Sequence, residues 1–182
     1  MVENPAGFWV RFGAQVIDAL IFIVLGLVLG AILSNGTSEW VSNIISFLYA
    51  LLLPVFWYGY TVGKKVLKVR IVKLDGSQVS FWTMIKRYVI AGIVYGLPSF
   101  LGVIGFLVTV GVSGFDVFMS ENLMNDEVLD GLLLKGFVWA MIGLLLSGVL
   151  YIISAFMIGL REDKRALHDL IAGTYVTKNK PN

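Results

Sequence analysis

Four long apolar runs, separated by shorter polar segments, make up most of the 182 residues. They cover residues about 10–34, 40–60, 84–112 and 136–160, and Pro54 and Pro98 are expected to kink or break the second and third. About twenty apolar residues in a helix cross the roughly 30 Å hydrocarbon core of a bilayer, and each run has that length or more. We therefore predict an all-α membrane protein, a four-transmembrane-helix bundle.

The first run carries a stripe of polar side chains. Arg11, Gln15 and Asp18 recur at i, i+4 and i+7, so they share one face of the predicted helix. Arg11 falls near the membrane interface, whereas Asp18 falls inside the apolar region. A carboxylate there costs about 2 to 3 kcal/mol on insertion scales, so Asp18 should face protein or trapped water rather than lipid. The rest of the chain must supply its partner.

The segment between the second and third runs has the pattern of β-strands. Residues 66–74 are rich in β-branched side chains that alternate with cations, and Asp75-Gly76 is a tight-turn sequence leading into residues 79–81. We predict a small basic β-hairpin within residues 63–83, with Ser80 as the N-cap of the next helix. The tail residues 173–178 suit a third strand.

The charges are sorted along the chain, although the formal net charge is only +2. The segment 63–83 and the tail 161–182 are basic, whereas the loop 113–135 is acidic. Four spans place the two basic segments on one side, and the positive-inside rule makes that side cytoplasmic. We predict a multi-pass protein with cytoplasmic N- and C-termini and an extracytoplasmic acidic loop. Its first helix is expected to be retained, because it lacks the features of a cleaved signal peptide.

Composition narrows the chemistry further. At 58% hydrophobic and 14% charged residues, with a mean hydropathy of +0.85, the chain is too apolar for a soluble domain. The absence of cysteine excludes disulfides, thiol catalysis and cysteine metal sites. No phosphate loop, nucleophile elbow or HExxH motif occurs, so we expect no enzyme, cofactor, metal or nucleic-acid partner. His168 is the single histidine, and although it can titrate near neutral pH, it has no second ligand beside it.

Several blocks of sequence follow one another in a recognisable order over nearly the whole chain. They are Gly7-Phe8-Trp9-Val10-Arg11 leading to Ile17-Asp18, Gly59-Tyr60-Thr61-Val62-Gly63-Lys64-Lys65, Val69-Arg70-Ile71-Val72 with Asp75-Gly76, Arg87, and Arg165-Ala166-Leu167-His168-Asp169-Leu170-Ile171-Ala172-Gly173-Thr174. With these blocks the chain resembles the RDD family of small bacterial membrane proteins, named for one arginine and two aspartates.

The resemblance implies that Arg11, Asp18 and Asp169 are the name-giving residues. It also implies a single RDD-like helical membrane domain over 1–182 in the bacterial cytoplasmic (inner) membrane, in a family for which transport has been suspected without a settled ligand. The chain departs from shorter relatives by its four apparent spans and by the extended acidic loop.

The candidate site is a charge network of Arg11, Gln15, Asp18, Arg87 and Asp169. Asp18 is either a protonatable or cation-coordinating carboxylate in a transport path or an interhelical lock bound to Arg87 or to backbone donors. For Asp169 a surface pair with Arg165 is the ordinary explanation, whereas the resemblance argues for a place at the cytoplasmic mouth.

A second candidate site lies in the basic segment. Lys64, Lys65, Lys68 and Arg70 are candidates for binding anionic lipid headgroups, with each cation near the surface contributing about 1 kcal/mol. Topology signalling explains these cations equally well.

Two functions from different classes fit this pattern. The first is transport of a small ion or solute, with cation or proton antiport as its most specific form. Four helices are few for an alternating-access transporter, so a homodimer or a membrane partner protein would be needed. The second is a non-transporting scaffold or accessory subunit that binds anionic lipid or a partner protein. A lipid-modifying enzyme using His168 and Asp169 is a weaker third option.

Overall fold

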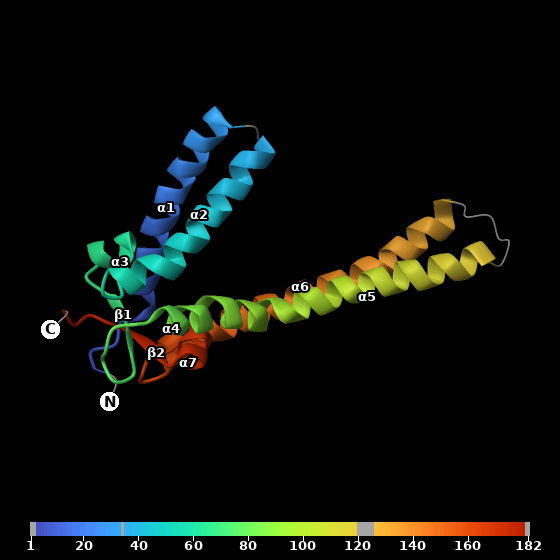
Figure 1. Ribbon diagram of the computed structural model, residues 1–182. Coiled ribbons are helices and arrows are strands. Elements are labelled where there is room, and N and C mark those ends of the chain that lie inside the picture. The colour runs from blue at the N-terminus through green and yellow to red at the C-terminus, as the bar shows by residue number, and fades with distance from the viewer. Residues whose placement is uncertain (1–2, 34, 120–125, 181–182) are drawn as a thin grey trace. The chain divides into compact units, whose positions relative to one another are not determined.

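A computed structural model describes residues 3–33, 35–119 and 126–180 (Figure 1). Most of these residues are helical, and one two-stranded sheet is present among them. In chain order the elements are α1 (Phe8–Ile32), α2 (Asn35–Phe56), α3 (Val62–Val66), β1 (Arg70–Lys73), α4 (Phe81–Ile85), the π-helix η1 (Lys86–Ile90), α5 (Ala91–Met119), α6 (Asp126–Leu160), α7 (Leu167–Ala172) and β2 (Thr174–Thr177).

Four helical stretches are long and apolar enough to cross a membrane. Within the described residues they are Phe8–Ile32, Gly36–Phe56, Phe81–Asp116 and Val128–Leu160. The third stretch is continuous because α4, η1 and α5 follow one another without a break. Pro54 and Pro98 both lie inside helices, so the helix of the third run continues through Pro98 and is not broken there.

The segment expected as an acidic loop, 113–135, is helical over most of its described length. Helix α5 continues to Met119 and α6 begins at Asp126, while residues 120–125 lie outside the described part of the chain. At about 1.5 Å per residue, the 35 residues of α6 measure about 52 Å, well over the roughly 30 Å hydrocarbon core.

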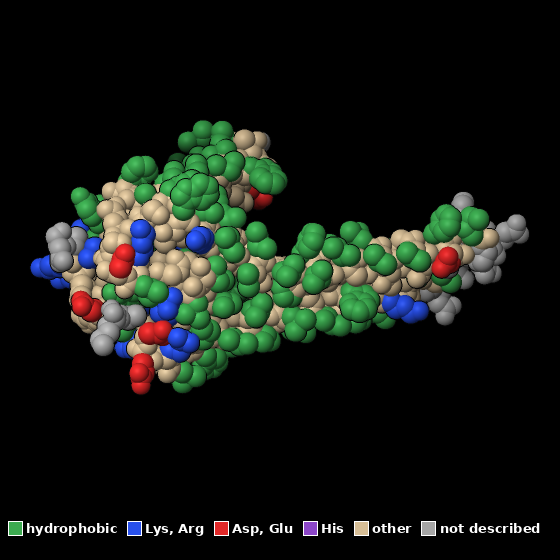
Figure 2. Space-filling model, turned by 60° about the horizontal axis from the view of Figure 1, so that its bottom comes forward, with side chains coloured by type: hydrophobic (Ala, Val, Ile, Leu, Met, Phe, Trp, Pro, Cys, Tyr) green, Lys and Arg blue, Asp and Glu red, His purple; other side chains and the backbone are tan. Residues whose placement is uncertain are grey.

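The chain divides into two compact units, Met1–Ala91 with Ser154–Asn182, and Gly92–Ile153. The second unit is a pair of helical segments that lie side by side in Figure 1. Glycines bring them together, because a Cβ on Gly102 would lie 2.6 Å from the carbonyl oxygen of Trp139. The Ser99 hydroxyl donates to Ser147 Oγ at 2.7 Å across the pair. Figure 2 shows apolar side chains along most of its length, as expected of a lipid-facing surface.

The sheet in the first unit differs from the predicted hairpin. Strand β1 lies where a strand was predicted, but it pairs antiparallel with the tail strand β2, from Arg70 opposite Thr177 to Lys73 opposite Thr174. The predicted return strand is reduced to one bridge between Val72 and Gln78. The turn at Gly76 forms as expected, with φ +79°, and Ser80 caps α4 by accepting from the Thr83 N–H. The predicted tail strand is therefore confirmed as β2, whereas the predicted hairpin is not confirmed beyond this one bridge.

The N-terminal lead joins the same sheet. The Ala6 N–H donates to the Val176 carbonyl at 2.8 Å, and the Lys178 N–H donates to the Asn4 carbonyl at 3.1 Å. Both ends of the described chain and the segment between α2 and α4 therefore meet in one place. Four membrane crossings require this arrangement, because an even number of spans returns the tail to the side of the lead.

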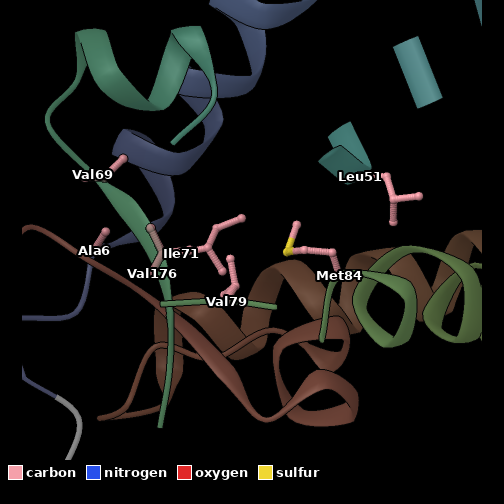
Figure 3. Packing of buried hydrophobic residues seen from close by; sticks show 7 residues of the cluster. All are labelled: Ala6, Leu51, Val69, Ile71, Val79, Met84 and Val176. Atoms are coloured by element: carbon pink, nitrogen blue, oxygen red, sulfur yellow. The ribbon is translucent and has the colours of Figure 1, made fainter. Parts of the chain in front are cut away.

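The apolar core of the first unit surrounds this sheet. Figure 3 shows seven buried side chains that converge from the N-terminal lead, α2, the sheet region and α4. Ile71 of β1 and Met84 of α4 have no exposed surface. Lipid-facing helices have little hydrophobic drive to pack on one another, whereas side chains outside the bilayer do, so the core forms where the chain leaves the membrane. The members are Ala6, Leu51, Val69, Ile71, Val79, Met84 and Val176.

Candidate functional site

Asp169 is the centre of a buried ionic cluster. It lies in the first turn of α7, and its side chain has no exposed surface. Arg11 Nη1 donates to Asp169 Oδ2 at 2.5 Å, and Arg87 Nη1 donates to Asp169 Oδ1. The Ala166 N–H at the start of α7 adds a bond to Oδ2 at 3.1 Å. One carboxylate therefore ties together α1, η1 and α7. We call Arg11, Arg87 and Asp169 the ionic lock.

Arg11 is held on every side of its guanidinium group. Its Nε donates to the Ala6 carbonyl at 2.9 Å and its Nη2 donates to the Lys164 carbonyl at 2.7 Å. Lys164 adopts a left-handed backbone with φ 48°, which is uncommon for a non-glycine residue. The guanidinium thus fixes both the chain before α1 and the turn before α7.

The ionic lock keeps Asp169 charged. Burial alone raises the pKa of the carboxyl group, but the positive charges of Arg87 and Arg11 outweigh this and hold the pKa well below its usual value. The pKa of neighbouring His168 is also lowered, which makes its imidazole a weaker base. Burial and the charge of Arg87 lower the pKa of His168 to about 3, so the imidazole is neutral at pH 7 rather than titrating there.

Asp18 occupies a separate site and is held by uncharged donors. The Tyr49 hydroxyl donates to Oδ1 at 2.7 Å, the Thr61 hydroxyl donates to Oδ2 at 2.6 Å, and the Gly63 N–H donates to Oδ1 at 2.7 Å. The residue is half-buried. Three donors therefore converge on the two oxygens of this carboxyl group. We call Asp18, Tyr49, Thr61 and Gly63 the Asp18 site.

The short helix α3 builds one wall of the Asp18 site. Thr61 is the N-cap of α3, and its hydroxyl also accepts from the Lys64 N–H at 3.3 Å. Tyr49 Oη accepts from the Val62 N–H at 2.8 Å while it donates to Asp18. Gly63 packs against α1 so closely that a Cβ would lie 2.0 Å from the Ala14 carbonyl oxygen. Glycine is therefore needed at this position for steric reasons.

The predicted charge network is thus divided in two. Arg11, Arg87 and Asp169 come together, but neither arginine binds Asp18, whose bonds come from uncharged groups. Gln15 shares the helical face of Arg11 and Asp18 but is exposed, and it joins neither site in the described part of the chain. The pairing of Asp169 with Arg165 is a backbone contact, in which Arg165 Nη2 donates to the Asp169 carbonyl at 3.2 Å.

The predicted lipid-binding cations have different surroundings. Arg70 is buried and donates through Nε and Nη2 to the carbonyls of Asn179 and Lys180, both at 3.0 Å. Lys65 is exposed and lies over the ring of Tyr60 at 4.4 Å. Lys68 is exposed and Lys64 is half-buried. Arg70 therefore anchors the tail, whereas Lys65 and Lys68 remain accessible to headgroups.

Two side chains of the Asp18 site were missed in the sequence. Tyr49 is the one tyrosine of the second apolar run that comes before the aromatic residues at the end of the run. A polar group inside a predicted span could have marked it as a candidate site residue. Thr61 lies in one of the blocks that carry the family resemblance, yet it was not singled out. Thr174, which accepts from Arg87 Nη1 at 2.6 Å, was missed in the same way.

These features define a class: a multi-pass helical membrane protein whose core and charged clusters gather where the chain leaves the bilayer. The profile of the RDD family matches residues 5–173, and the chain belongs to the RDD family.

Two relatives come from Bacillus subtilis (strain 168). The uncharacterized protein YckC is 35% identical over 183 residues, which cover 99% of this chain and 89% of YckC. The uncharacterized protein YxaI is 31% identical over 130 residues, which cover 57% of this chain and 85% of YxaI. No solved structure matches the chain significantly.

Proposed function

We propose that this RDD-family protein moves a small cation or proton across the bacterial inner membrane, with Asp18 as the exchanging carboxylate. The observation that carries the proposal is the donor set of Asp18. Its donors are two hydroxyls and one backbone N–H, with no guanidinium or ammonium among them. A carboxylate inside a span that lacks a cationic partner keeps its negative charge available to a proton or cation.

The hydroxyls make exchange chemically simple. Tyr49 and Thr61 donate to the carboxylate when the site is empty of cation, and each oxygen can turn its lone pairs toward a cation when one arrives. Carboxylate, hydroxyl and carbonyl oxygens are the ligands that hard cations prefer. Asp169 does not suit this role, because its charge is already neutralised by Arg11 and Arg87.

The orientation belongs to the same proposal. The basic segment 63–83 and the tail meet at the sheet, and the positive-inside rule assigns that side to the cytoplasm. The Asp18 site then lies on the cytoplasmic half of α1, next to α3. A proton or cation that leaves Asp18 on this side enters the cytoplasm.

The test is ion and proton flux in proteoliposomes made with the wild type and with Asp18→Asn. We expect the variant to abolish flux while the protein keeps its folded, monodisperse elution in detergent, because the amide oxygen can still accept from Tyr49 and the Gly63 N–H, and the amide NH2 can donate to the Thr61 hydroxyl oxygen. Asp75→Asn is the matched control, since Asp75 is an exposed carboxylate on a turn and should leave flux unchanged. Tyr49→Phe should reduce flux, because it removes a ligand oxygen but keeps the ring.

The scaffold alternative has its own observation. Asp18 also holds α3 against α1, through Thr61 and Gly63, and that contact alone gives it a structural use. Absence of flux in the wild type, with a large loss of stability in Asp18→Asn, would support the scaffold and overturn transport.

A further inference from the structure

The ionic lock buries more positive than negative charge. Two guanidinium groups share one carboxylate, and the side chains of Arg11, Arg87 and Asp169 are 9%, 5% and 0% exposed. A buried charge that is not matched by a partner is costly. Lys64 adds a third positive charge nearby, because it disfavours protonation of His168 together with Arg87 and Arg11.

The five arginines of the chain use their guanidinium groups in the same way, with one exception. In four of them the edge formed by Nε and Nη2 donates to two oxygens. Arg11 binds two carbonyls, Arg70 binds two carbonyls, Arg165 binds two carbonyls, and Arg161 binds both carboxylate oxygens of Asp163 at 2.8 Å.

Arg87 is the exception. Both of its bonds to protein come from Nη1, to Asp169 and to Thr174. Its Nε and Nη2 donate to no acceptor among the described residues. Neither nitrogen is sealed inside the protein, because no fully enclosed side-chain nitrogen or oxygen in the described chain lacks a partner. Each of the two nitrogens therefore keeps some accessible surface, in a side chain that is 5% exposed, and has no protein acceptor among the described residues.

The neighbours of Arg87 in sequence have the pattern of a helix segment at the level of the lipid headgroups. Trp82, one turn earlier, is 71% exposed, and Lys86 beside it is exposed. Val89 and Ile90, which follow on η1, are exposed apolar side chains. A tryptophan and a lysine beside lipid-facing apolar residues mark the membrane interface. The acceptors that abound there, and that match a guanidinium edge with two oxygens, are phosphates.

We propose that the Nε–Nη2 edge of Arg87 binds the phosphate of an anionic phospholipid headgroup. The phosphate supplies the negative charge that the ionic lock lacks. Two of its oxygens accept from Nε and Nη2 of Arg87, as the two carboxylate oxygens of Asp163 accept from those of Arg161. The proposal is independent of transport, because it makes no use of Asp18. It also differs from headgroup binding by the exposed lysines, which lack a fork of two donors.

The test is native mass spectrometry of the full chain, released from detergent to which one of two lipids has been added. The lipids are phosphatidylglycerol and diacylglycerol, and diacylglycerol lacks the phosphate. We expect the wild type to retain phosphatidylglycerol and not diacylglycerol. Arg87→Lys keeps a cation for Asp169 but loses the fork, so phosphatidylglycerol binding should weaken about tenfold or more, since a two-donor bond between charged groups is lost. Arg161→Lys is the matched control and should bind as the wild type does.

Equal phosphatidylglycerol binding by Arg87→Lys and the wild type overturns the proposal, as does equal retention of diacylglycerol. If inorganic phosphate at equal concentration displaces the lipid, the phosphate that Arg87 binds need not belong to a phospholipid, and this result would overturn the lipid as its source. If Arg87→Lys does not fold, the wild type decides the question. Solid-state NMR with guanidinium ¹⁵N-labelled protein in phosphatidylglycerol vesicles should show dipolar coupling between ³¹P and arginine ¹⁵N, and its absence contradicts the site.

Discussion

Asp169 and Asp18 carry the same functional group in opposite electrostatic settings. Asp169 lies between two guanidinium groups and has no exposed surface, whereas Asp18 is half-buried among hydroxyls and one N–H. Neighbouring charge, more than burial, decides how firmly a carboxylate holds its negative form. This contrast is the basis on which we propose Asp169 as a stabiliser of the fold and Asp18 as the exchanging carboxylate.

Asp169→Asn should destabilise the protein by about 3 to 5 kcal/mol, because it leaves Arg11 and Arg87 buried without a counter-charge. The measurement is denaturant-induced unfolding in mild detergent, followed by tryptophan fluorescence. Asp163→Asn serves as the control. Asp163 is partly exposed and pairs with the exposed Arg161, so its loss should cost less than about 1 kcal/mol. Similar losses in the two variants would contradict the role given to the ionic lock.

Sequence reasoning identified most of these residues, but it could not predict which of them bind one another. Periodicity places Arg11 and Asp18 on one helical face, and the family resemblance points to Asp169. Periodicity within one helix, however, says nothing about a partner 158 positions away, such as Asp169 for Arg11. Tyr49 and Thr61 were missed for the same reason, because their bonds to Asp18 depend on how α2 and α3 pack on α1.

At the scale of the elements, the short helix α3 is the piece most sensitive to close packing. It follows α2 and brings Thr61 and Gly63 to Asp18. Its contact with α1 depends on the missing side chain of Gly63, since a Cβ there would lie 2.0 Å from the Ala14 carbonyl oxygen and 3.0 Å from Asp18 Cγ.

Gly63→Ala should push α3 away from α1 and lower stability by about 1 to 3 kcal/mol, the usual cost of overpacking. The thermal unfolding midpoint in detergent is the measurement. Gly30→Ala is the control in α1, because a Cβ at Gly30 meets nothing within 4 Å. If Gly63→Ala lowers the unfolding midpoint no more than Gly30→Ala does, the packing of α3 against α1 is loose.

The elements themselves were largely predictable, and their pairing was not. Four apolar runs gave four spanning helices, and β-branched residues marked β1. The turn at Gly76 also formed, yet β1 pairs with β2 instead of the segment after the turn. A strand pattern fixes which face is buried but not which strand lies alongside. Here the buried tail residues Tyr175 and Val176 offer a better partner than the single bridge at Gln78.

For the whole molecule, the sheet joins segments that are far apart in sequence. The N-terminal lead, β1 and β2 meet, so both ends and the basic segment lie on one side of the membrane. An even number of spans follows from this pairing alone.

Single cysteines can check this topology, because the chain has none of its own. Ser77→Cys and Lys178→Cys lie on the side of the sheet, and Asp130→Cys lies near the start of α6; all three positions are exposed. On intact cells a membrane-impermeant maleimide should label only Asp130→Cys, whereas inverted vesicles should show the reverse. Labelling of Ser77→Cys and Lys178→Cys from opposite sides would contradict four spans.

The ionic lock also has a consequence for how the protein is made. Arg11 enters the membrane with the first helix, but Asp169 leaves the ribosome only after the last span has been synthesised. Until then Arg11 and Arg87 have no Asp169 to bind, and β1 has no β2 to pair with. A nascent chain cut short between η1 and α7 therefore contains Arg11 and Arg87 but lacks the carboxylate that both of them bind.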